Sequence, residues 1–205
     1  MIAFTCYGAW LALLVVVAEQ RALNPRLRGA IKLCASGCFV AVGALADRGD
    51  PYSRWMLAGL ALGAIGDAAL LGRGGRAFVI GLGAFLCGHL AYVAGIATLV
   101  PPARWLAPLA ALPIAIGGAA LIWLWPRLGR MRAPVIAYVA AIVAMVIGAL
   151  AARDRRFLAP GAALFFASDL AVARDRFVAP GPANRMWGLP AYYAGQLLIA
   201  WSIAG

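Results

Sequence analysis

Charged residues are scarce in this chain of 205 residues: they make up 12% of it, whereas hydrophobic residues make up 65%. Soluble domains are typically about a quarter charged and about half apolar, so this composition excludes an ordinary soluble domain and a disordered chain. Apolar runs long enough to cross a bilayer, which need about 20 residues each, follow one another along most of the sequence. We therefore expect an all-α, polytopic membrane helix bundle in which residues 1–205 form a single integral membrane domain.

Histidine and cysteine are also few. The chain has one His and four Cys, and every Cys lies in an apolar run. Cys34 and Cys38 are one helical turn apart, but neither a His nor a second Cys pair lies near them in the sequence. We interpret Cys6, Cys34, Cys38 and Cys87 as small packing residues. The sequence therefore predicts neither a metal site nor a cofactor.

Acidic residues number seven against 18 Lys and Arg, which gives a formal net charge of +11. In a soluble protein this excess would suggest nucleic-acid binding. Here the arginines lie in short loops between apolar runs, so we interpret them as topology signals and contacts to lipid headgroups, and we expect no nucleic-acid partner. The N-terminus lacks a basic segment and a small-residue cleavage site, so the first apolar run is expected to be a retained span.

Eight apolar runs, separated by charged or turn-forming residues, predict about eight transmembrane helices. Their predicted ranges are 2–18, 30–46, 55–72, 77–99, 104–125, 133–152, 157–173 and 187–204. Pro113 lies inside the fifth range and predicts a kink there. Gly59, Gly63 and Gly66 place small residues along one side of the third helix, which favours close contact with neighbouring helices.

The loop arginines predict the orientation of these helices. Eleven arginines lie in the first, third, fifth and seventh loops, and six lie in the other three. Because cytoplasmic loops carry an excess of Lys and Arg, we expect the odd-numbered loops in the cytoplasm and both termini outside, in a bacterial inner membrane. The sixth loop disagrees with this pattern, because it contains Arg153, Arg155 and Arg156.

A few ionisable residues lie inside the predicted spans. Asp67 is in the third span, His89 in the fourth and Asp169 in the seventh, and Lys32 is near the start of the second. A carboxylate at membrane depth costs on the order of 2.5–3.5 kcal/mol on insertion scales, so it is expected to be neutral, paired or facing a wet cavity. Such residues are candidates for a functional site.

These side chains are predicted to converge on one side of the membrane. At a rise of about 1.5 Å per residue, Asp67 and Asp169 lie one to two turns from the cytoplasmic ends of their helices, and His89 lies nearer the midplane. Further candidates for substrate binding in the same cleft are Lys32, Tyr92, Ser168, Tyr192, Tyr193 and Gln196. A structural role stays open for several of them, because tyrosines anchor helices at the interface, lysine reaches toward headgroups, and a lone histidine often only forms hydrogen bonds.

The order and spacing of these residues resemble the YhhN family of eight-span lysoplasmalogenases. The resemblance lies in Gly66-Asp67, His89 with Tyr92, Ser168-Asp169 with the later Asp175-Arg176-Phe177, and Tyr192-Tyr193 with Gln196. Lys32 falls where the family tends to carry a lysine, although no proline follows it here. The match runs from about residue 30 to residue 204. It implies hydrolysis of the vinyl ether bond of a lysoplasmalogen, which yields a fatty aldehyde and glycerophosphoethanolamine or glycerophosphocholine.

The candidate residues also suit this chemistry on their own grounds. A vinyl ether is cleaved by protonation of its β-carbon, addition of water to the resulting oxocarbenium ion, and collapse of the hemiacetal. Apolar burial favours a neutral carboxyl that can donate the proton, and a second, ionised carboxylate can activate water. We expect Asp67 and Asp169 to divide these roles in an order that the sequence leaves open. His89 would orient water or a carboxylate, and Lys32 with the loop arginines would bind the lipid phosphate.

Other classes of membrane protein use similar residues. A zinc-dependent hydrolase could use His89 and the two aspartates, although such sites usually contain more histidines. An intramembrane aspartyl protease would need Gly-x-Gly-Asp, but Ala64 stands at the first Gly position, and the Gly-x-Ser-x-Gly of a rhomboid-type protease is missing. A small proton-coupled transporter could use Asp67, Asp169 and His89 as a relay, although the internal repeat typical of transporters is faint.

Overall fold

The structure, a computed structural model, describes residues 1–21, 24–72, 74–106 and 108–205. Within these residues the chain forms eight α-helices and three short 3-10 turns, without a strand. The helices are α1 (Ile2–Gln20), α2 (Pro25–Ala46), α3 (Pro51–Ala69), α4 (Gly75–Leu99), α5 (Ala111–Leu128), α6 (Arg132–Ala151), α7 (Leu158–Phe177) and α8 (Pro182–Ser202). The predicted all-α fold class is confirmed. Arg73, one of the arginines counted for orientation, lies outside the described residues.

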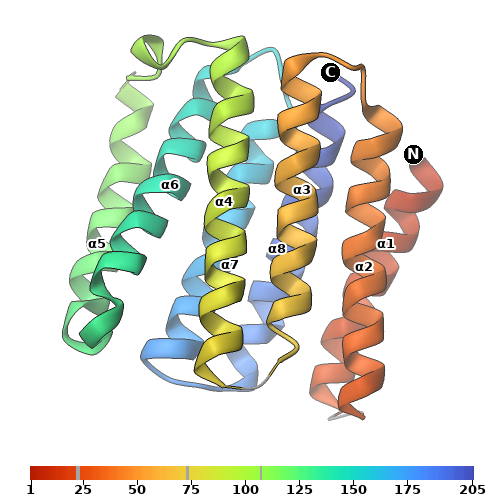
Figure 1. Cartoon of the computed structure of the whole chain (residues 1–205), viewed down its shortest axis with the longest axis vertical. Helices are drawn as coiled ribbons and strands as arrows, with labels where there is room; N and C mark the ends of the chain where they lie inside the picture. The colour runs from red at the N-terminus through yellow and green to blue at the C-terminus, as the bar shows by residue number, and fades with distance from the viewer. Residues whose placement is uncertain (22–23, 73, 107) are drawn as a thin grey trace.

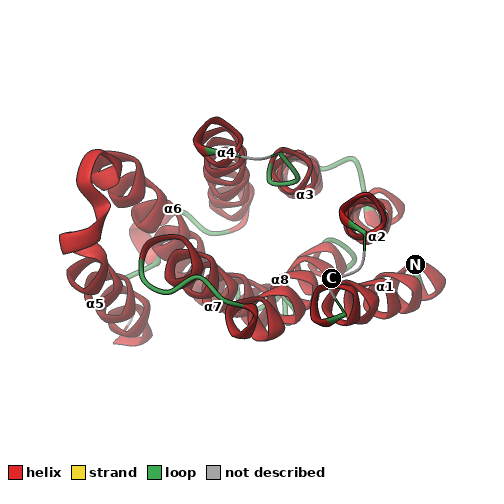
Figure 2. Cartoon of the chain, turned by 90° about the horizontal axis from the view of Figure 1, so that it is seen from below, coloured by secondary structure: helices red, strands yellow, loops and turns green. Residues whose placement is uncertain are grey.

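The helices alternate in direction along one long axis (Figure 1). Both termini lie at the upper end of the bundle, and α3 and α7 finish at the lower end, where α4 and α8 begin. Seen from below, α2, α3 and α4 form one row that faces α1, α8, α7 and α6 (Figure 2). Contacts between neighbours close these helices into a ring, and α5 packs on the outside against α6. This ring encloses the space in which a site can form.

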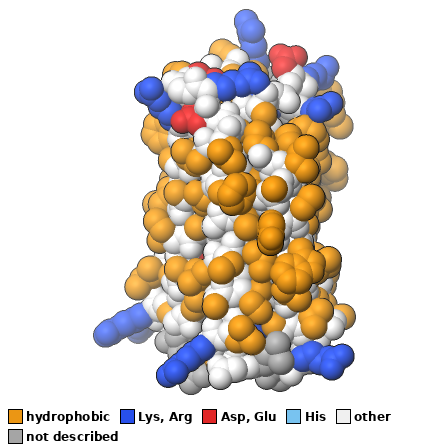
Figure 3. Space-filling view, turned by 90° about the vertical axis from the view of Figure 1, so that its right-hand side faces the viewer, with side chains coloured by type: hydrophobic (Ala, Val, Ile, Leu, Met, Phe, Trp, Pro, Cys, Tyr) orange, Lys and Arg blue, Asp and Glu red, His pale blue; other side chains and the backbone are white. Residues whose placement is uncertain are grey.

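On the face seen in Figure 3, hydrophobic side chains cover the middle of the bundle, and charged side chains gather at its two ends. Among the described residues, four segments are long and apolar enough to cross a membrane: Ile2–Gln20, Pro25–Ala46, Gly75–Leu99 and Pro108–Ala151, the last of which contains α5 and α6. Large hydrophobic side chains are exposed on these segments, including Leu13, Ile80 and Ile122. The chain is therefore a multi-pass membrane protein. For α3, α7 and α8, which carry polar side chains, crossing of the membrane stays a prediction.

Three helices, α2, α3 and α8, begin four or five residues earlier than predicted because a helix-start signal extends them beyond their apolar part. Asn24 and Asp50 accept hydrogen bonds of 2.9 and 2.7 Å from backbone amides in the first turns of α2 and α3. Each is followed by a proline, which at the first helical position needs no partner for its missing N–H. As a result, α2 begins at 25 rather than 30 and α3 at 51 rather than 55, and α8 begins at Pro182 rather than at 187.

The fifth helix begins later than predicted. Residues 102–104 and 108–110 form 3-10 turns, and α5 starts at Ala111 instead of 104. Pro113 therefore lies in the first turn of α5, where its missing N–H leaves no hydrogen bond unmade. The kink predicted at Pro113 is wrong, because this proline belongs to the start of the helix.

Small residues on α3 allow close contact with α4 in the same row and with α8 in the facing row. A Cβ at Gly59 would lie 2.3 Å from Tyr92 Cε1, and a Cβ at Gly63 would lie 2.4 Å from Gln196 Nε2. The close contact predicted for this face of α3 is confirmed. In lipid, where apolar burial drives helix association only weakly, such close packing holds a bundle together.

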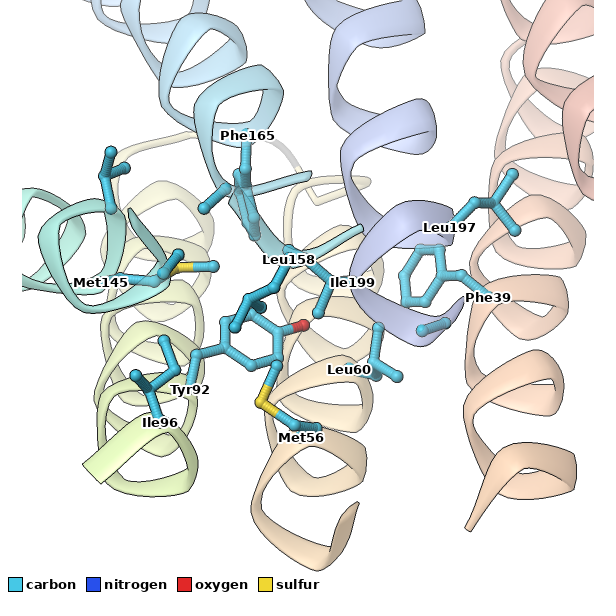
Figure 4. Packing of buried hydrophobic residues seen from close by; sticks show 14 of the residues in the cluster. Phe39, Met56, Leu60, Tyr92, Ile96, Met145, Leu158, Phe165, Leu197 and Ile199 are labelled. Carbon is cyan, nitrogen blue, oxygen red and sulfur yellow. The ribbon is translucent and has the colours of Figure 1, made fainter. Parts of the chain in front are cut away.

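The packed core lies around this contact (Figure 4). Its fully buried side chains come from both rows of helices and include Phe39, Met56, Leu60, Tyr92, Ile96, Met145, Leu158 and Ile199. Tyr92 lies among these apolar side chains with its hydroxyl turned toward α8, where Gln196 accepts its hydrogen bond. The core therefore fixes polar side chains that belong to the site.

Candidate active site

A cavity of about 610 Å³ is lined by helices of the ring and by α5, and it reaches the lower end of the bundle. This volume is in the usual range for a small-molecule site. Apolar side chains of α4, α5 and α6 form one part of its wall, among them Leu82, Leu124, Val135, Val139 and Ile142. Its interior polar side chains are Lys32, Asp67, Tyr138, Ser168, Asp169 and Tyr192. Both candidate aspartates therefore line one cavity.

Asp67 lies near the end of α3, with 3% of its side chain exposed. Its Oδ2 accepts hydrogen bonds from Ser36 Oγ at 2.6 Å and from the Tyr192 hydroxyl at 2.7 Å. Lys32 Nζ lies 3.4 Å from Oδ1. A carboxyl that accepts two hydroxyl hydrogens and faces an ammonium group has the surroundings of an ionised carboxylate.

Asp169 lies in α7 and has different neighbours. The Tyr138 hydroxyl on α6 donates to Oδ1 at 3.1 Å, and His89 Nε2 on α4 lies 3.3 Å from Oδ2. Asp169 keeps 16% of its side chain exposed, and it lines the cavity. It is therefore the more accessible of the two carboxyls to a bound molecule.

The hydrogen bonds of the His89 ring determine how many protons His89 and Asp169 hold together. His89 Nδ1 lies 2.8 Å from the Phe85 carbonyl oxygen, which can only accept, so Nδ1 carries a hydrogen. The contact between Nε2 and Asp169 then needs one more hydrogen, bound either to the ring or to the carboxyl. Asp169 and His89 thus share one transferable proton. Because the His89 side chain is fully buried, this proton can reach the cavity only through Asp169.

Tyr92 and Gln196 lie behind Tyr192 and outside the cavity lining. The Tyr92 hydroxyl donates to Gln196 Oε1 at 2.8 Å, and Gln196 Nε2 lies at 3.3 Å from the Tyr192 hydroxyl oxygen, which accepts its hydrogen. The Tyr192 hydrogen is then directed at Asp67. This arrangement makes Tyr92 and Gln196 positioning residues for Tyr192, rather than residues that touch a ligand.

Tyr193 and Ser168 direct their hydroxyl groups at the backbone. Tyr193 donates to the Lys32 carbonyl oxygen at 3.3 Å, which ties α8 to α2, and Ser168 donates to the Phe165 carbonyl oxygen at 2.8 Å. Of the predicted substrate-binding residues, Lys32, Ser168 and Tyr192 line the cavity. Tyr193 lies outside its lining.

Sequence reasoning missed two residues of the site, Ser36 and Tyr138. Ser36 lies one helical turn after Lys32, so that both face Asp67. The four-residue spacing from Lys32 could have predicted that Ser36 belongs to the site. Tyr138 lies about two turns inside α6, deeper than an interfacial anchor usually lies. That depth is the one feature of the sequence that could have predicted its place in the site.

Two phenylalanine rings pack against the residues that contact the two carboxyls. The Phe165 ring lies 4.7 Å from the His89 ring and 5.3 Å from the Tyr192 ring, and Phe85 lies 5.9 Å from Tyr192, measured between centroids. The faces of such rings attract positive charge. Both Phe85 and Phe165 line the cavity, which therefore combines two carboxyls with surfaces that favour a cation.

An all-α membrane bundle with two differently surrounded aspartates in one cavity defines a class of intramembrane acid–base site. The chain belongs to the YhhN family, whose sequence pattern matches residues 27–203, so the resemblance found in the sequence is confirmed. A lysoplasmalogenase of Mycobacterium bovis is 34% identical over 209 residues, which cover 97% of this chain and 78% of the relative. The lysoplasmalogenase TMEM86B of Sus scrofa is 33% identical over 160 residues, which cover 77% of this chain and 67% of that relative. No solved structure is significantly similar to this one.

Proposed function

We propose that this chain is a membrane hydrolase that cleaves the vinyl ether bond of lysoplasmalogens to a fatty aldehyde and a glycerophosphoethanolamine or glycerophosphocholine. The observation that carries the proposal is that Asp67 and Asp169, with different hydrogen-bond donors, line one largely apolar cavity. The names of the mycobacterial and mammalian relatives support it. We propose a single integral membrane domain and no cofactor for this reaction.

The cavity suits an amphiphile with one alkenyl chain. Leu124, Val135 and Ile142 offer an apolar surface to the chain, and Lys32 offers an ammonium group to the phosphate. The vinyl ether, which joins the chain to the glycerol, then lies between these two parts. That is the region in which Asp67 and Asp169 face the cavity.

Asp169 is the general acid in this mechanism. It transfers the proton that it shares with His89 to the β-carbon of the vinyl ether, and the double-bond electrons form the new C–H bond. The α-carbon becomes an oxocarbenium ion, a cation that the aromatic rings of Phe165 and Phe85 in the cavity lining favour. Asp67 is less suited to this step, because its oxygens already accept hydrogens from Ser36 and Tyr192 and face Lys32.

Asp67 is the general base for the water that follows. Water adds to the α-carbon, and its proton passes to the Asp67 carboxylate, which leaves a hemiacetal. Asp67 then returns that proton to the glycerol oxygen as the carbon–oxygen bond breaks, and the hemiacetal hydroxyl loses its proton to Asp169. The cycle consumes one water and restores both carboxyls. Enzymes that cleave acetals with two carboxyls likewise use one as a general acid and the other as a carboxylate.

Aldehyde release from a synthetic alkenyl lysophosphatidylethanolamine tests the proposal. The purified protein in detergent is expected to release aldehyde without an ion gradient, which a proton-coupled transporter cannot do. Asp67→Asn and Asp169→Asn are each expected to lower kcat by about 100-fold or more, because each removes an acid–base group. Asp154→Asn, an exposed aspartate between α6 and α7, is the matched control and is expected to keep full activity. Absence of aldehyde with the unmodified protein would contradict the function, and full turnover by either site variant would remove that aspartate from the mechanism.

We also propose that the protein lies in a bacterial plasma membrane with both termini outside. The excess of arginine in the odd-numbered loops supports this orientation. The lower end of the bundle, which the cavity reaches, then faces the cytoplasm. A lysophospholipid would enter from the cytoplasmic leaflet.

A further inference from the structure

The cavity ends at the lower end of the bundle beside a group of ion pairs that the proposed mechanism does not use. Glu19, in the last turn of α1, accepts hydrogen bonds at Oε2 from Arg28 Nη1 of α2 at 2.9 Å and from Arg185 Nη1 of α8 at 2.8 Å. Glu19 and Arg185 line the cavity. We infer that this Arg28–Glu19–Arg185 cluster binds the zwitterionic headgroup of the lysophospholipid. The arginines bind the phosphate, and Glu19 binds the amine and selects ethanolamine over choline; this inference rests on the proposed function.

Spacing along α2 connects the cluster to the reacting groups. Arg28, Lys32 and Ser36 are four residues apart and so follow one face of the helix, with a rise of about 6 Å per step. Ser36 and Lys32 contact Asp67, whereas Arg28 contacts Glu19. In a lysoplasmalogen, six covalent bonds separate the phosphorus from the carbon that takes up water, which is a similar length. A phosphate at the level of Arg28 and Lys32 therefore places the vinyl ether at the level of Asp67.

The cluster has hydrogen-bonding capacity left for such a ligand. Both arginines bind the same oxygen of Glu19, and among the described residues Oε1 accepts no hydrogen bond. The buried Nε of Arg28 likewise has no acceptor within the described part of the chain. A guanidinium has five N–H donors and binds phosphate through two of them, and a carboxylate oxygen can accept from an ammonium. A phosphate and an amine thus match the groups that the cluster leaves unpaired.

The start of α8 holds Arg185 in place. Asn184, which precedes it, is buried, and its Nδ2 donates to Asp175 Oδ1 at 3.0 Å and to the Ala179 carbonyl oxygen at 2.7 Å. The backbone amide of Gly181 donates to the same Asp175 oxygen at 2.9 Å. These bonds fix the link between α7 and α8 and with it the backbone that carries Arg185, while the Arg185 side chain is held by Glu19.

The amine contact predicts headgroup preference. An ethanolamine ammonium can donate hydrogen bonds to Glu19, whereas the quaternary nitrogen of choline has no hydrogen to donate. A hydrogen bond to a charged group corresponds to roughly tenfold or more in affinity. Glu19 lies before residue 27, where the family match begins. The residue that sets the preference for ethanolamine over choline is therefore outside the matched segment.

The first test compares kcat/KM for alkenyl lysophosphatidylethanolamine and alkenyl lysophosphatidylcholine. The unmodified protein is expected to prefer ethanolamine, and Glu19→Gln is expected to reduce the ratio of the two kcat/KM values about tenfold. Arg185→Gln is expected to raise KM for both lipids, because both carry the phosphate. Asp154→Asn, an exposed residue between α6 and α7 at the opposite end of the bundle, is the matched control. A Glu19→Gln variant that keeps the headgroup preference of the unmodified protein overturns the inference.

The second test measures binding without turnover and so separates this inference from the proposed reaction. Saturated 1-alkyl lysophosphatidylethanolamine and 1-alkyl lysophosphatidylcholine lack the double bond, and their binding is followed by the thermal shift of the purified protein. Tighter binding of the ethanolamine lipid that Glu19→Gln abolishes supports the headgroup site, even if the unmodified protein releases no aldehyde. Equal binding of the two lipids by the unmodified protein overturns it, whatever the result for aldehyde release.

Discussion

Asp67 and Asp169 show how neighbours assign different roles to one residue type. Asp67 is surrounded by hydrogen-bond donors and an ammonium group, which suits a carboxylate. Asp169 contacts a histidine that is itself fixed by the Phe85 carbonyl, which gives the pair one transferable proton. The difference does not lie in the two short motifs that contain the aspartates. It lies in side chains that reach them from other helices.

This assignment predicts the effect of changing His89. His89→Gln keeps a polar side chain but cannot hold a proton, so we expect kcat to fall by about 100-fold, in the range typical of general acid catalysis, with little change in KM. Tyr138→Phe removes only one hydrogen bond to Asp169 and is expected to lower kcat less, by about tenfold or below. The measurement is the pH dependence of kcat for aldehyde release. His89→Gln should alter its shape, whereas Tyr138→Phe should shift it.

Changing Lys32 tests the role of Asp67, as changing His89 tests the role of Asp169. Lys32→Gln removes the ammonium beside Asp67 and is expected to affect the limb of the pH profile that reports the base. A profile that His89→Gln leaves unchanged, but in which Lys32→Gln changes the high-pH limb that reports the general acid, would assign the general acid to Asp67 instead. Protein with both changes would then behave as Lys32→Gln alone.

At the residue scale, the sequence could predict which side chains belong to the site but not what each one does. A carboxyl or histidine inside an apolar run is conspicuous, so Asp67, His89 and Asp169 were found without coordinates. The proton count on His89 depends on the Phe85 carbonyl oxygen and on Asp169, 80 positions away in the sequence. That information exists only once the helices are packed.

At the scale of helices, the glycine face of α3 supports the site. Gly63 leaves room for Gln196, which donates to Tyr192, which in turn donates to Asp67. Gly63→Ala would place a Cβ 2.4 Å from Gln196 Nε2, so Gln196 has to move. We expect a loss of about 1–3 kcal/mol in stability, as is typical of overpacking, together with a lower kcat.

A second glycine provides the control for that change. Gly37 lies in the interior of α2, and a Cβ there would have no atom within 4 Å. Gly37→Ala is therefore expected to keep full activity and to be as stable as the unmodified protein or slightly more so. The measurements are thermal unfolding in detergent and aldehyde release. Equal behaviour of the two alanine variants would show that α3 does not need its small residue at Gly63.

The positions of the helices could be predicted from apolar runs, but their ends could not. Charged residues were taken as breaks, although Asn24-Pro25 and Asp50-Pro51 are helix-start signals that carry α2 and α3 past them. The late start of α5 depends on a contact that is distant in sequence. The Trp105 ring donates to the Val100 carbonyl oxygen at 2.8 Å and packs against α6, where a Cβ at Gly148 would meet it at 3.0 Å. That packing leaves the segment before α5 outside the helix.

At the scale of the whole molecule, the site forms between the two halves of the chain. Asp67 belongs to α3 and receives a hydrogen bond from Tyr192 of α8, whereas Asp169 belongs to α7 and contacts His89 of α4. Each aspartate in one half of the chain is thus completed by a side chain from the other half. The pairing cannot be seen in any local motif, and it makes the cavity a consequence of closing the ring.

The orientation of that ring in the membrane is the last expectation that can be tested. Arg130, between α5 and α6, lies at the same end as the cavity mouth, and Asp154, between α6 and α7, lies at the opposite end. Both residues are exposed, and single cysteines can replace them once Cys6, Cys34, Cys38 and Cys87 have been changed to serine or alanine. In intact bacterial cells that express these variants, a maleimide that does not cross membranes is expected to label Asp154→Cys.

Arg130→Cys should react with the same reagent only after the cells are permeabilised. The reverse labelling would show that the three arginines of the sixth loop, and not the total over all loops, set the topology. The contacts among Asp67, Asp169 and His89 would be unchanged, because the direction of every helix would invert together. The substrate would then come from the outer leaflet, so that orientation decides which pool of lysophospholipid the cavity can reach.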